Sequence, residues 1–240
     1  SSRYGTHVTT FVLVHGAWHG AWCWELLAPE LEARGHHALA VDLPIDVPGK
    51  GLADYAEVVR AAMPEGDVVL VGHSLGATVI PLVAAAMPVR RLVFLCPVLR
   101  RPGMSLAEQA ALDSDASTWD LSTGRTFFDD ESSAWEPPAA IPVFFHDCPP
   151  ELAQWAAMRL RRQYSRYWDE PNPLDAWPRA EYAAIVCRDD RLVGLTWARR
   201  ALPAELGATP IELPGGHSPF LSRPTDLAEA LVSSESHSAG

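Results

Sequence analysis

The chain has 240 residues, of which 48% are hydrophobic, enough for one α/β domain with a complete core. Its formal net charge of -11 disfavours nucleic acid and anionic membrane surfaces as partners, and no apolar run is long enough to span a membrane. The first residues lack a signal-peptide pattern, and the four cysteines are too scattered for a disulfide or zinc framework. We therefore expect a cytoplasmic protein, monomeric or homodimeric, that has no membrane or nucleic-acid partner.

The first predicted strand covers residues 9–14 and is continuously apolar, as in a parallel strand buried on both faces. A loop of sequence His-Gly-Ala-Trp-His-Gly follows it. Such a loop can aim a backbone N–H at a reacting carbonyl oxygen, and we assign this role to Ala17. The spacing of His15 and His19 also suggests a metal site. Because the two lie in a loop without a carboxylate cluster, we favour a structural role and predict no metal.

The next feature is a short apolar strand, residues 67–71, that runs into Gly-His-Ser-Leu-Gly and then into an apolar helix. A serine between two glycines in this strand–turn–helix context is a nucleophile elbow. The turn is so tight that side chains at Gly72 and Gly76 would collide with neighbouring backbone. The elbow presents the hydroxyl of Ser74 at the sheet edge, and the N–H of Leu75 becomes the second candidate oxyanion donor.

Strands and helices alternate through the first 98 residues and again after residue 179, which predicts a parallel sheet with helices on both faces. Besides those above, we predict strands at 37–43, 91–98, 181–187 and 209–213, and helices at 21–34, 52–63, 194–206 and 224–232. The predicted fold is an α/β-hydrolase fold with about six mostly parallel strands. Residues 1–98 and 179–234 would form its core, and residues 235–240 a disordered tail.

Between these two parts, residues 99–178 are rich in proline and aromatic residues and interrupt the alternation. A segment this long between two sheet strands predicts a lid or cap, which we expect to be helical, with one helix over residues 151–167. Four arginines of this segment suggest either a site for a substrate carboxylate or a solvated helix face, and we favour the second interpretation. They are Arg159, Arg161, Arg162 and Arg166.

Three residues occur in the chain order of an α/β-hydrolase triad: Ser74, an acid after a late strand, and a histidine after the last strand. A serine hydroxyl needs a base during attack, and His217 is the candidate. The imidazole needs a fixed carboxylate behind it. Asp189 and Asp190 both compete for this position, and we choose Asp190 because the strand-end loop brings it there. The segment after residue 95 reads Cys-Pro-Val-Leu, without a carboxylate, which supports the later acid.

The sequences of residues 11–24 and 71–76 resemble the plant methylesterase and hydroxynitrile lyase family and its bacterial esterase relatives. This resemblance implies a six-stranded parallel core, a mobile lid, a Ser-His-Asp triad, small ester substrates and no cofactor. The lyase members need a lysine beside the catalytic histidine and a threonine after the histidine of the first motif. Here Ser218 follows His217, Gly16 follows His15, and the only lysine is Lys50. These departures favour ester hydrolysis over cyanohydrin cleavage.

The sequence therefore predicts a serine hydrolase of small or medium carboxylic esters, such as a methyl ester or lactone of a secondary metabolite. We expect Trp18, His73 and Ser218 to contact the substrate. A thioesterase, cyclase or acyltransferase on the same acyl-enzyme is one alternative, because these enzymes differ only in the acceptor and in water exclusion. A non-hydrolytic ligand-binding protein that retains the fold is another.

Overall fold

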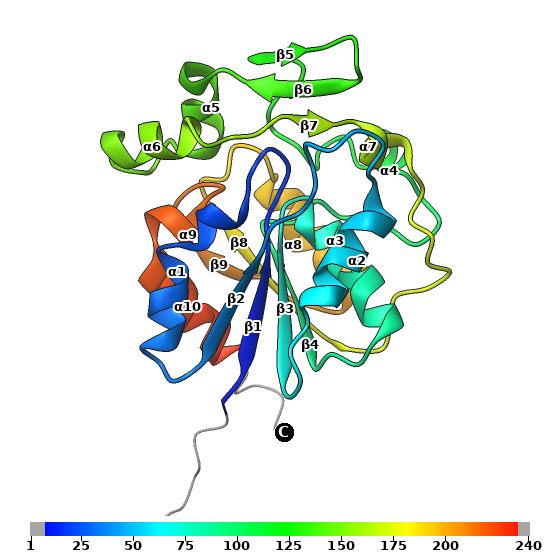
Figure 1. Ribbon diagram of the computed structural model, residues 1–240, viewed down its shortest axis with the longest axis vertical. Coiled ribbons are helices and arrows are strands. Elements are labelled where there is room, and N and C mark those ends of the chain that lie inside the picture. Colours follow the sequence, from blue (N-terminus) through cyan, green and yellow to red (C-terminus); the bar gives the residue numbers. More distant parts are fainter. Residues whose placement is uncertain (1–7, 235–240) are drawn as a thin grey trace, which may run out of the picture.

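The protein is described here by a computed structural model that covers residues 8–234 (Figure 1). The predicted disordered tail, residues 235–240, lies outside the described residues. A six-stranded, fully parallel sheet forms the centre, with the strand order β2-β1-β3-β4-β8-β9. The strands are Thr10–Val14 (β1), His37–Val41 (β2), Val68–His73 (β3), Arg91–Leu95 (β4), Glu181–Cys187 (β8) and Ile211–Leu213 (β9). The predicted sheet of about six mostly parallel strands is therefore confirmed.

The register of the strands brings their carboxyl ends to one edge of the sheet. Val14 pairs with Gly72, and Leu95 pairs with both His73 and Ile185. The central strands are buried along their whole length because helices cover both faces, which explains their continuous apolar sequences. Consequently the loop after β1, the elbow after β3 and the loops after β8 and β9 emerge together.

Helices cover both faces of the sheet, with α1 and α10 on one face and α2 and α3 on the other (Figure 1). The core helices are Leu27–Glu32 (α1), Leu52–Ala62 (α2), Gly76–Ala86 (α3), Leu195–Leu206 (α8), Pro219–Ser222 (α9) and Pro224–Ser233 (α10). The single helix predicted over residues 21–34 is wrong, because a 3₁₀ turn at Ala21–Trp24 precedes α1. Pro29 has no N–H to donate and is best tolerated in the first turn of a helix, which agrees with a start of α1 just before it.

The segment between β4 and β8 lies across the carboxyl edge of the sheet (Figure 1), and we call residues 96–180 the insertion. It contains the helices Leu106–Leu112 (α4), Pro137–Phe144 (α5), Pro150–Ala157 (α6) and Arg166–Asp169 (α7). It also contains a three-stranded antiparallel sheet of Arg125–Phe127 (β5), Ser132–Trp135 (β6) and Gln163–Tyr164 (β7). The insertion is therefore mixed rather than only helical.

The helix predicted over residues 151–167 ends at Ala157, and the chain beyond it is held by contacts with other parts of the protein. The N–H of Arg161 donates to the carbonyl oxygen of Trp18, and the N–H of Tyr164 donates to that of Ile45. These hydrogen bonds to distant segments outweigh the weak helical periodicity of the chain after Ala157. The second half of the predicted helix was therefore wrong. Within residues 8–234, none of the helices is both long and apolar enough to cross a membrane.

Candidate active site

The turn after β3 has the geometry of a strained nucleophile elbow. Ser74 has a φ of 51°, in the left-handed region that residues with a side chain seldom adopt. A Cβ at Gly72 would lie 2.6 Å from the carbonyl oxygen of Gly76, and one at Gly76 would lie 2.3 Å from that of Val14. Only glycine fits at either position, which agrees with the collision expected from the sequence. The turn holds the Ser74 side chain at the sheet edge, where it is only partly buried.

His217 and Asp190 meet after the last two strands of the sheet. The Nδ1 of His217 lies 2.8 Å from the Oδ2 of Asp190, and both side chains are 1% exposed. The other carboxylate oxygen of Asp190 accepts from the amides of Leu192 and Val193, at 2.8 and 3.1 Å. A carboxylate fixed in this way holds the imidazole with a hydrogen on Nδ1 and leaves Nε2 as its base atom.

The alternative acid, Asp189, faces a different partner. Its Oδ2 accepts from the amide of Gly215 at 3.0 Å, and its own amide donates to the carbonyl oxygen of Gly215 at 3.0 Å. Asp189 therefore ties the loop after β8 to the loop after β9. The structure brings Asp190, and not Asp189, to the imidazole of His217.

A cavity of about 140 Å³ is lined by Ser74, His217, Ala17 and Leu75. Within residues 8–234, the backbone N–H groups of Ala17 and Leu75 donate to no other protein group. Two unpaired N–H groups beside a serine hydroxyl can bind a negatively charged oxygen. Much of the remaining lining is apolar and comes from the insertion and from the region around α8: Leu99, Leu106, Phe144, Leu192 and Trp197.

His73 and His19 line the same cavity as neutral imidazoles. Burial lowers the pKa of His19 to about 3 and that of His73 well below its usual value. The Nε2 of His73 lies 2.9 Å from the carbonyl oxygen of His217, so Nε2 carries the hydrogen and Nδ1 is a bare acceptor. That Nδ1 and the Nε2 of His19 are both buried and unpartnered within the described part of the chain. These two histidines therefore add no positive charge to the wall of the cavity.

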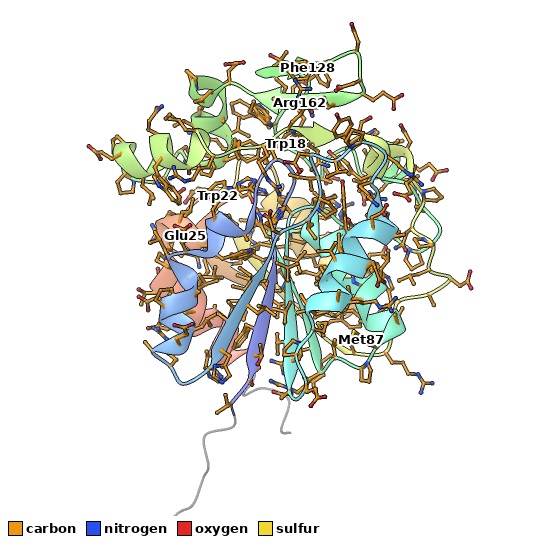
Figure 2. The ribbon with its side chains drawn as sticks, viewed as in Figure 1. Trp18, Trp22, Glu25, Met87, Phe128 and Arg162 are labelled. Carbon is orange, nitrogen blue, oxygen red and sulfur yellow. The ribbon has the colours of Figure 1, made fainter. Side chains whose placement is uncertain are left out.

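The other two predicted substrate contacts differ in position. Trp18 is buried, lines the cavity and donates from its indole N–H to Ser133 Oγ at 3.2 Å. Figure 2 shows Trp18 between the upper end of the sheet and the insertion. Ser218, in contrast, is 0% exposed and is not among the residues that line the cavity. Because the chain turns into α9 directly after Ser218, its side chain is buried in the core.

Sequence reasoning missed the role of Arg161 in fixing the loop after β1. Its Nε donates to the carbonyl oxygen of His19 at 2.9 Å, and its Nη2 donates to that of Leu43 at 3.0 Å. His15 accepts from the amide of Leu43 at 2.9 Å and therefore has a structural role, as predicted. The favoured interpretation of Arg161 as part of a solvated helix face is wrong, because this side chain is turned toward the loop. Hydrogen-bond partners more than a hundred residues apart leave no local sequence signal.

A second missed contact joins the insertion to the two loops that carry Asp190 and His217. The Oδ2 of Asp147 accepts from the amide of Gly216 at 2.8 Å, and the Nε2 of His146 donates to the carbonyl oxygen of Asp189 at 3.0 Å. Each partner immediately precedes a member of the His217–Asp190 pair. The insertion therefore contacts the backbone that orients this pair.

Cys96, at the end of β4, lies close to Asp190 and His217. The Sγ of Cys96, a carboxylate oxygen of Asp190 and a ring nitrogen of His217 all lie within 4.8 Å of one another. The hydrogen bond with the Cys187 thiol, together with burial and the Asp190 charge, raises the pKa of the Cys96 thiol well above its usual value. It therefore remains protonated beside the carboxylate. The cysteines within residues 8–234 are all free, as expected; Cys23, Cys96 and Cys187 are buried, whereas Cys148 is only partly buried.

Comparison with known proteins gives similarities over nearly the whole chain. A family profile described as "Alpha/beta hydrolase family" matches residues 11–230. Pyrethroid hydrolase from Sphingobium wenxiniae is 30% identical over 250 residues, which cover 94% of this chain and 87% of that protein. Methylesterase 2 from Arabidopsis thaliana is 28% identical over 257 residues, which cover 92% and 94%. The crystal structure of a pyrethroid hydrolase from Sphingobium faniae has a TM-score of 0.78 at 26% identity, covering 97% and 99%.

Proposed function

The chain belongs to the alpha/beta hydrolase family, and from this premise we propose that it is a serine hydrolase of small or medium carboxylic esters. One observation carries the proposal, namely the 2.8 Å contact of His217 with Asp190 beside a cavity that Ser74 also lines. The names of the relatives, a methylesterase and a pyrethroid hydrolase, support an ester as the substrate. Within this class we favour a methyl ester or a lactone.

In the proposed first half-reaction, Ser74 Oγ attacks the ester carbonyl carbon while His217 Nε2 takes the hydroxyl proton. Asp190 stabilises the positive charge that develops on the imidazole. The N–H groups of Ala17 and Leu75 bind the oxyanion of the tetrahedral intermediate. His217 then gives its proton to the leaving alcohol, and the acyl group remains on Ser74. In the second half-reaction, water attacks the acyl-enzyme with His217 again as base.

The apolar side chains of the cavity support an ester with an apolar group next to its carbonyl. Leu106 and Phe144, both from the insertion, line the cavity together with Trp197 of α8. We propose that residues 99–178 act as a lid that excludes bulk water and selects the substrate. Trp18 and His73 are the proposed substrate contacts, and Ser218 is not retained because it is buried away from the cavity.

The geometry at Gly16 supports hydrolysis over cyanohydrin cleavage. A Cβ at Gly16 would lie 2.9 Å from the Cβ of Ser74 and 3.0 Å from the Nδ1 of His73. The threonine that the lyases carry after the first histidine therefore does not fit here without displacement of the elbow. Ser218 also stands where the lyases need a lysine beside the base.

The test is release of p-nitrophenol from short acyl esters by the wild type and by Ser74→Ala. We expect kcat to fall by about 10⁶-fold in the variant, because a nucleophile and its base act as a unit. Ser117→Ala is the matched control, since Ser117 lines the same cavity and has no role in the proposed reaction. Near-normal activity of Ser74→Ala would show that Ser74 is not the nucleophile.

Two further measurements separate the alternative functions. Addition of a competing alcohol distinguishes hydrolysis, which yields the acid, from acyl transfer, which yields a new ester. A fluorophosphonate probe tests the nucleophile without turnover. Labelling that requires Ser74 supports the serine hydrolase. Saturable binding of small molecules without labelling or turnover would favour the non-hydrolytic protein.

A further inference from the structure

A second cavity adjoins the catalytic one inside the insertion. Its volume is about 550 Å³, compared with about 140 Å³ for the catalytic cavity. Four residues line both cavities, which therefore meet at these side chains: Trp18, Leu121, Tyr167 and Trp168. Pockets that enclose a drug-sized ligand have volumes of about 300 to 1,000 Å³. The second cavity is therefore large enough to hold the part of a substrate that exceeds the catalytic cavity.

The guanidinium of Arg125 lines the second cavity and is held in a fixed position. Its Nε donates to the carbonyl oxygen of Leu121 at 2.5 Å, and its Nη1 donates to Ser133 Oγ at 3.3 Å. The group also lies over two aromatic rings, 4.9 Å from the ring centre of Trp18 and 4.6 Å from that of Phe127. Trp18 thus links Arg125 directly to the catalytic cavity.

Within residues 8–234, Arg125 forms no ion pair, although it is largely withdrawn from solvent. Burial lowers the pKa of its guanidinium, yet an arginine side chain stays charged in a protein. The cavity has two carboxylates, Asp120 and Glu131, and both residues are exposed. Asp120 already accepts from the amide and hydroxyl of Ser122, at 2.9 and 2.7 Å. Asp120 interacts electrostatically with Arg125, but no carboxylate within residues 8–234 forms an ion pair with this guanidinium, and such a partly buried positive charge favours an anionic ligand.

Gln163 gives a second and independent indication that this cavity holds a polar ligand. It is 1% exposed, and its Nε2 donates to Tyr55 Oη at 3.1 Å and to the carbonyl oxygen of Tyr164 at 3.0 Å. Its Oε1 is buried and, among the residues that the structure describes, has no hydrogen-bond partner. Buried polar atoms are seldom left unpaired in proteins, so an unpaired acceptor on a residue that lines the cavity is an indication of a polar group bound nearby.

We propose that the second cavity binds a carboxylate of the substrate, remote from the ester, and that Arg125 determines this specificity. This inference rests on the proposed function and narrows its substrate class to esters that carry a free carboxylate. The planar guanidinium suits a carboxylate because it presents several N–H donors in one plane. The acceptor of Gln163 then suits a hydroxyl or amide N–H near that carboxylate.

The experiment compares kcat/KM for monomethyl esters of straight-chain dicarboxylic acids with that for methyl esters of monocarboxylic acids of equal length. Because the distance from Ser74 to the carboxylate site is set by both cavities, a series of chain lengths is needed. We expect the wild type to prefer the anionic ester about tenfold or more at its best length. A wild-type preference at or below unity for every length would overturn the proposal.

Variants at Arg125 then test the residue itself. We expect Arg125→Gln to lower kcat/KM for the anionic ester and thereby to abolish the preference. Arg125→Lys keeps the positive charge and should restore part of the preference. Arg162→Gln is the matched control, because Arg162 lies over Phe128 and pairs with Asp130 without lining either cavity (Figure 2). An equal loss for both esters in Arg125→Gln would assign it a structural role and overturn the proposal. Salt gives a test without substitution, since about 0.5 M NaCl should weaken only the anionic preference.

A separate measurement distinguishes failure of the proposed esterase function from failure of the proposed carboxylate site. Hydrolysis of p-nitrophenyl acetate that depends on Ser74 tests the esterase, whatever the second cavity binds. If that hydrolysis is absent, calorimetric titration with monomethyl suberate still tests the cavity. Binding that is about tenfold weaker in Arg125→Gln supports the carboxylate site, and no binding to the wild type overturns it.

Discussion

The carboxylate of Asp147 lies 2.8 Å from the amide nitrogen of Gly216, the residue that precedes His217. The Oδ1 of Asp147 is also buried, and a Cβ at Gly216 would lie 2.9 Å from it. The loop that carries His217 is therefore packed directly against the insertion. It follows that docking of the insertion and orientation of His217 are coupled, in addition to any role of the insertion in substrate selection.

We predict that Asp147→Ala lowers kcat about tenfold or more, because displacement of the base by about 1 Å is costly to the reaction. Asp147→Asn keeps an acceptor for the amide of Gly216 and should retain most of the activity. Asp129→Ala, an exposed acid of the same insertion, is the control. Steady-state kinetics with a p-nitrophenyl ester measures the effect. An unchanged kcat in Asp147→Ala would show that the loop of the base keeps its position without this contact.

The two adjacent acids after β8 provide an internally matched pair of variants. Asp190→Asn should lower kcat by about 10⁴-fold, since the amide cannot hold the imidazole in the required tautomer. Asp189→Asn removes the carboxylate that accepts from the amide of Gly215 and should have a much smaller effect. The kcat of both variants is measured under one set of conditions. A larger loss in Asp189→Asn would mean that the acid was assigned incorrectly.

Residues whose roles depend on their own short segment were predictable from the sequence. The elbow at Ser74 requires glycine on both sides, and the strand that ends before Asp190 has a clear apolar pattern. Parallel strands also bring their carboxyl ends to the same edge, so the order of the motifs was enough to place them together. The loop after β1 and the elbow after β3 carry Ala17 and Leu75, so the positions of these two N–H groups were predictable as well.

Features that depend on contacts between distant segments were not predictable. The strand β7 contains two residues and exists because β6 pairs with it, while the periodicity of its own sequence favoured a helix. Arg125 and Arg161 are both arginines of one polar segment, yet one lines a cavity and the other binds the loop after β1. Composition alone does not separate these roles, because burial is decided by the fold of the whole insertion.

We predict that Arg161→Ala loosens the loop that carries Ala17. The substitution removes charged hydrogen bonds to the carbonyl oxygens of His19 and Leu43, each worth about 1.5 to 3 kcal/mol. Both thermal stability and kcat should fall. Arg159→Ala is the control, since Arg159 is exposed and lies over the ring of Trp155. Hydrogen exchange at residues 15–20 measures the loosening directly, and unchanged protection there would contradict the prediction.

The buried neutral histidines predict how stability depends on pH. Burial lowers the pKa of His15 and His19 to about 3 and that of His73 well below its usual value, whereas in the unfolded chain each titrates near 6.5. Between these limits the unfolded state binds a proton that the folded state does not. The free energy of unfolding therefore falls as the pH drops below about 6.5, by about 1.4 kcal/mol per pH unit for each histidine.

Urea denaturation at about pH 7 and about pH 5 measures this slope in the wild type and in His19→Gln. Because carboxylates add to the slope at acid pH, the informative quantity is the difference between the two proteins. Removal of one buried histidine should flatten the dependence, so that the variant loses less stability on acidification than the wild type. His37→Gln replaces an exposed histidine and is the control for the loss of a histidine elsewhere in the chain. An equal or steeper slope in His19→Gln would mean that His19 is protonated in the folded state. This result would contradict the conclusion that the buried histidines of the cavity wall are neutral.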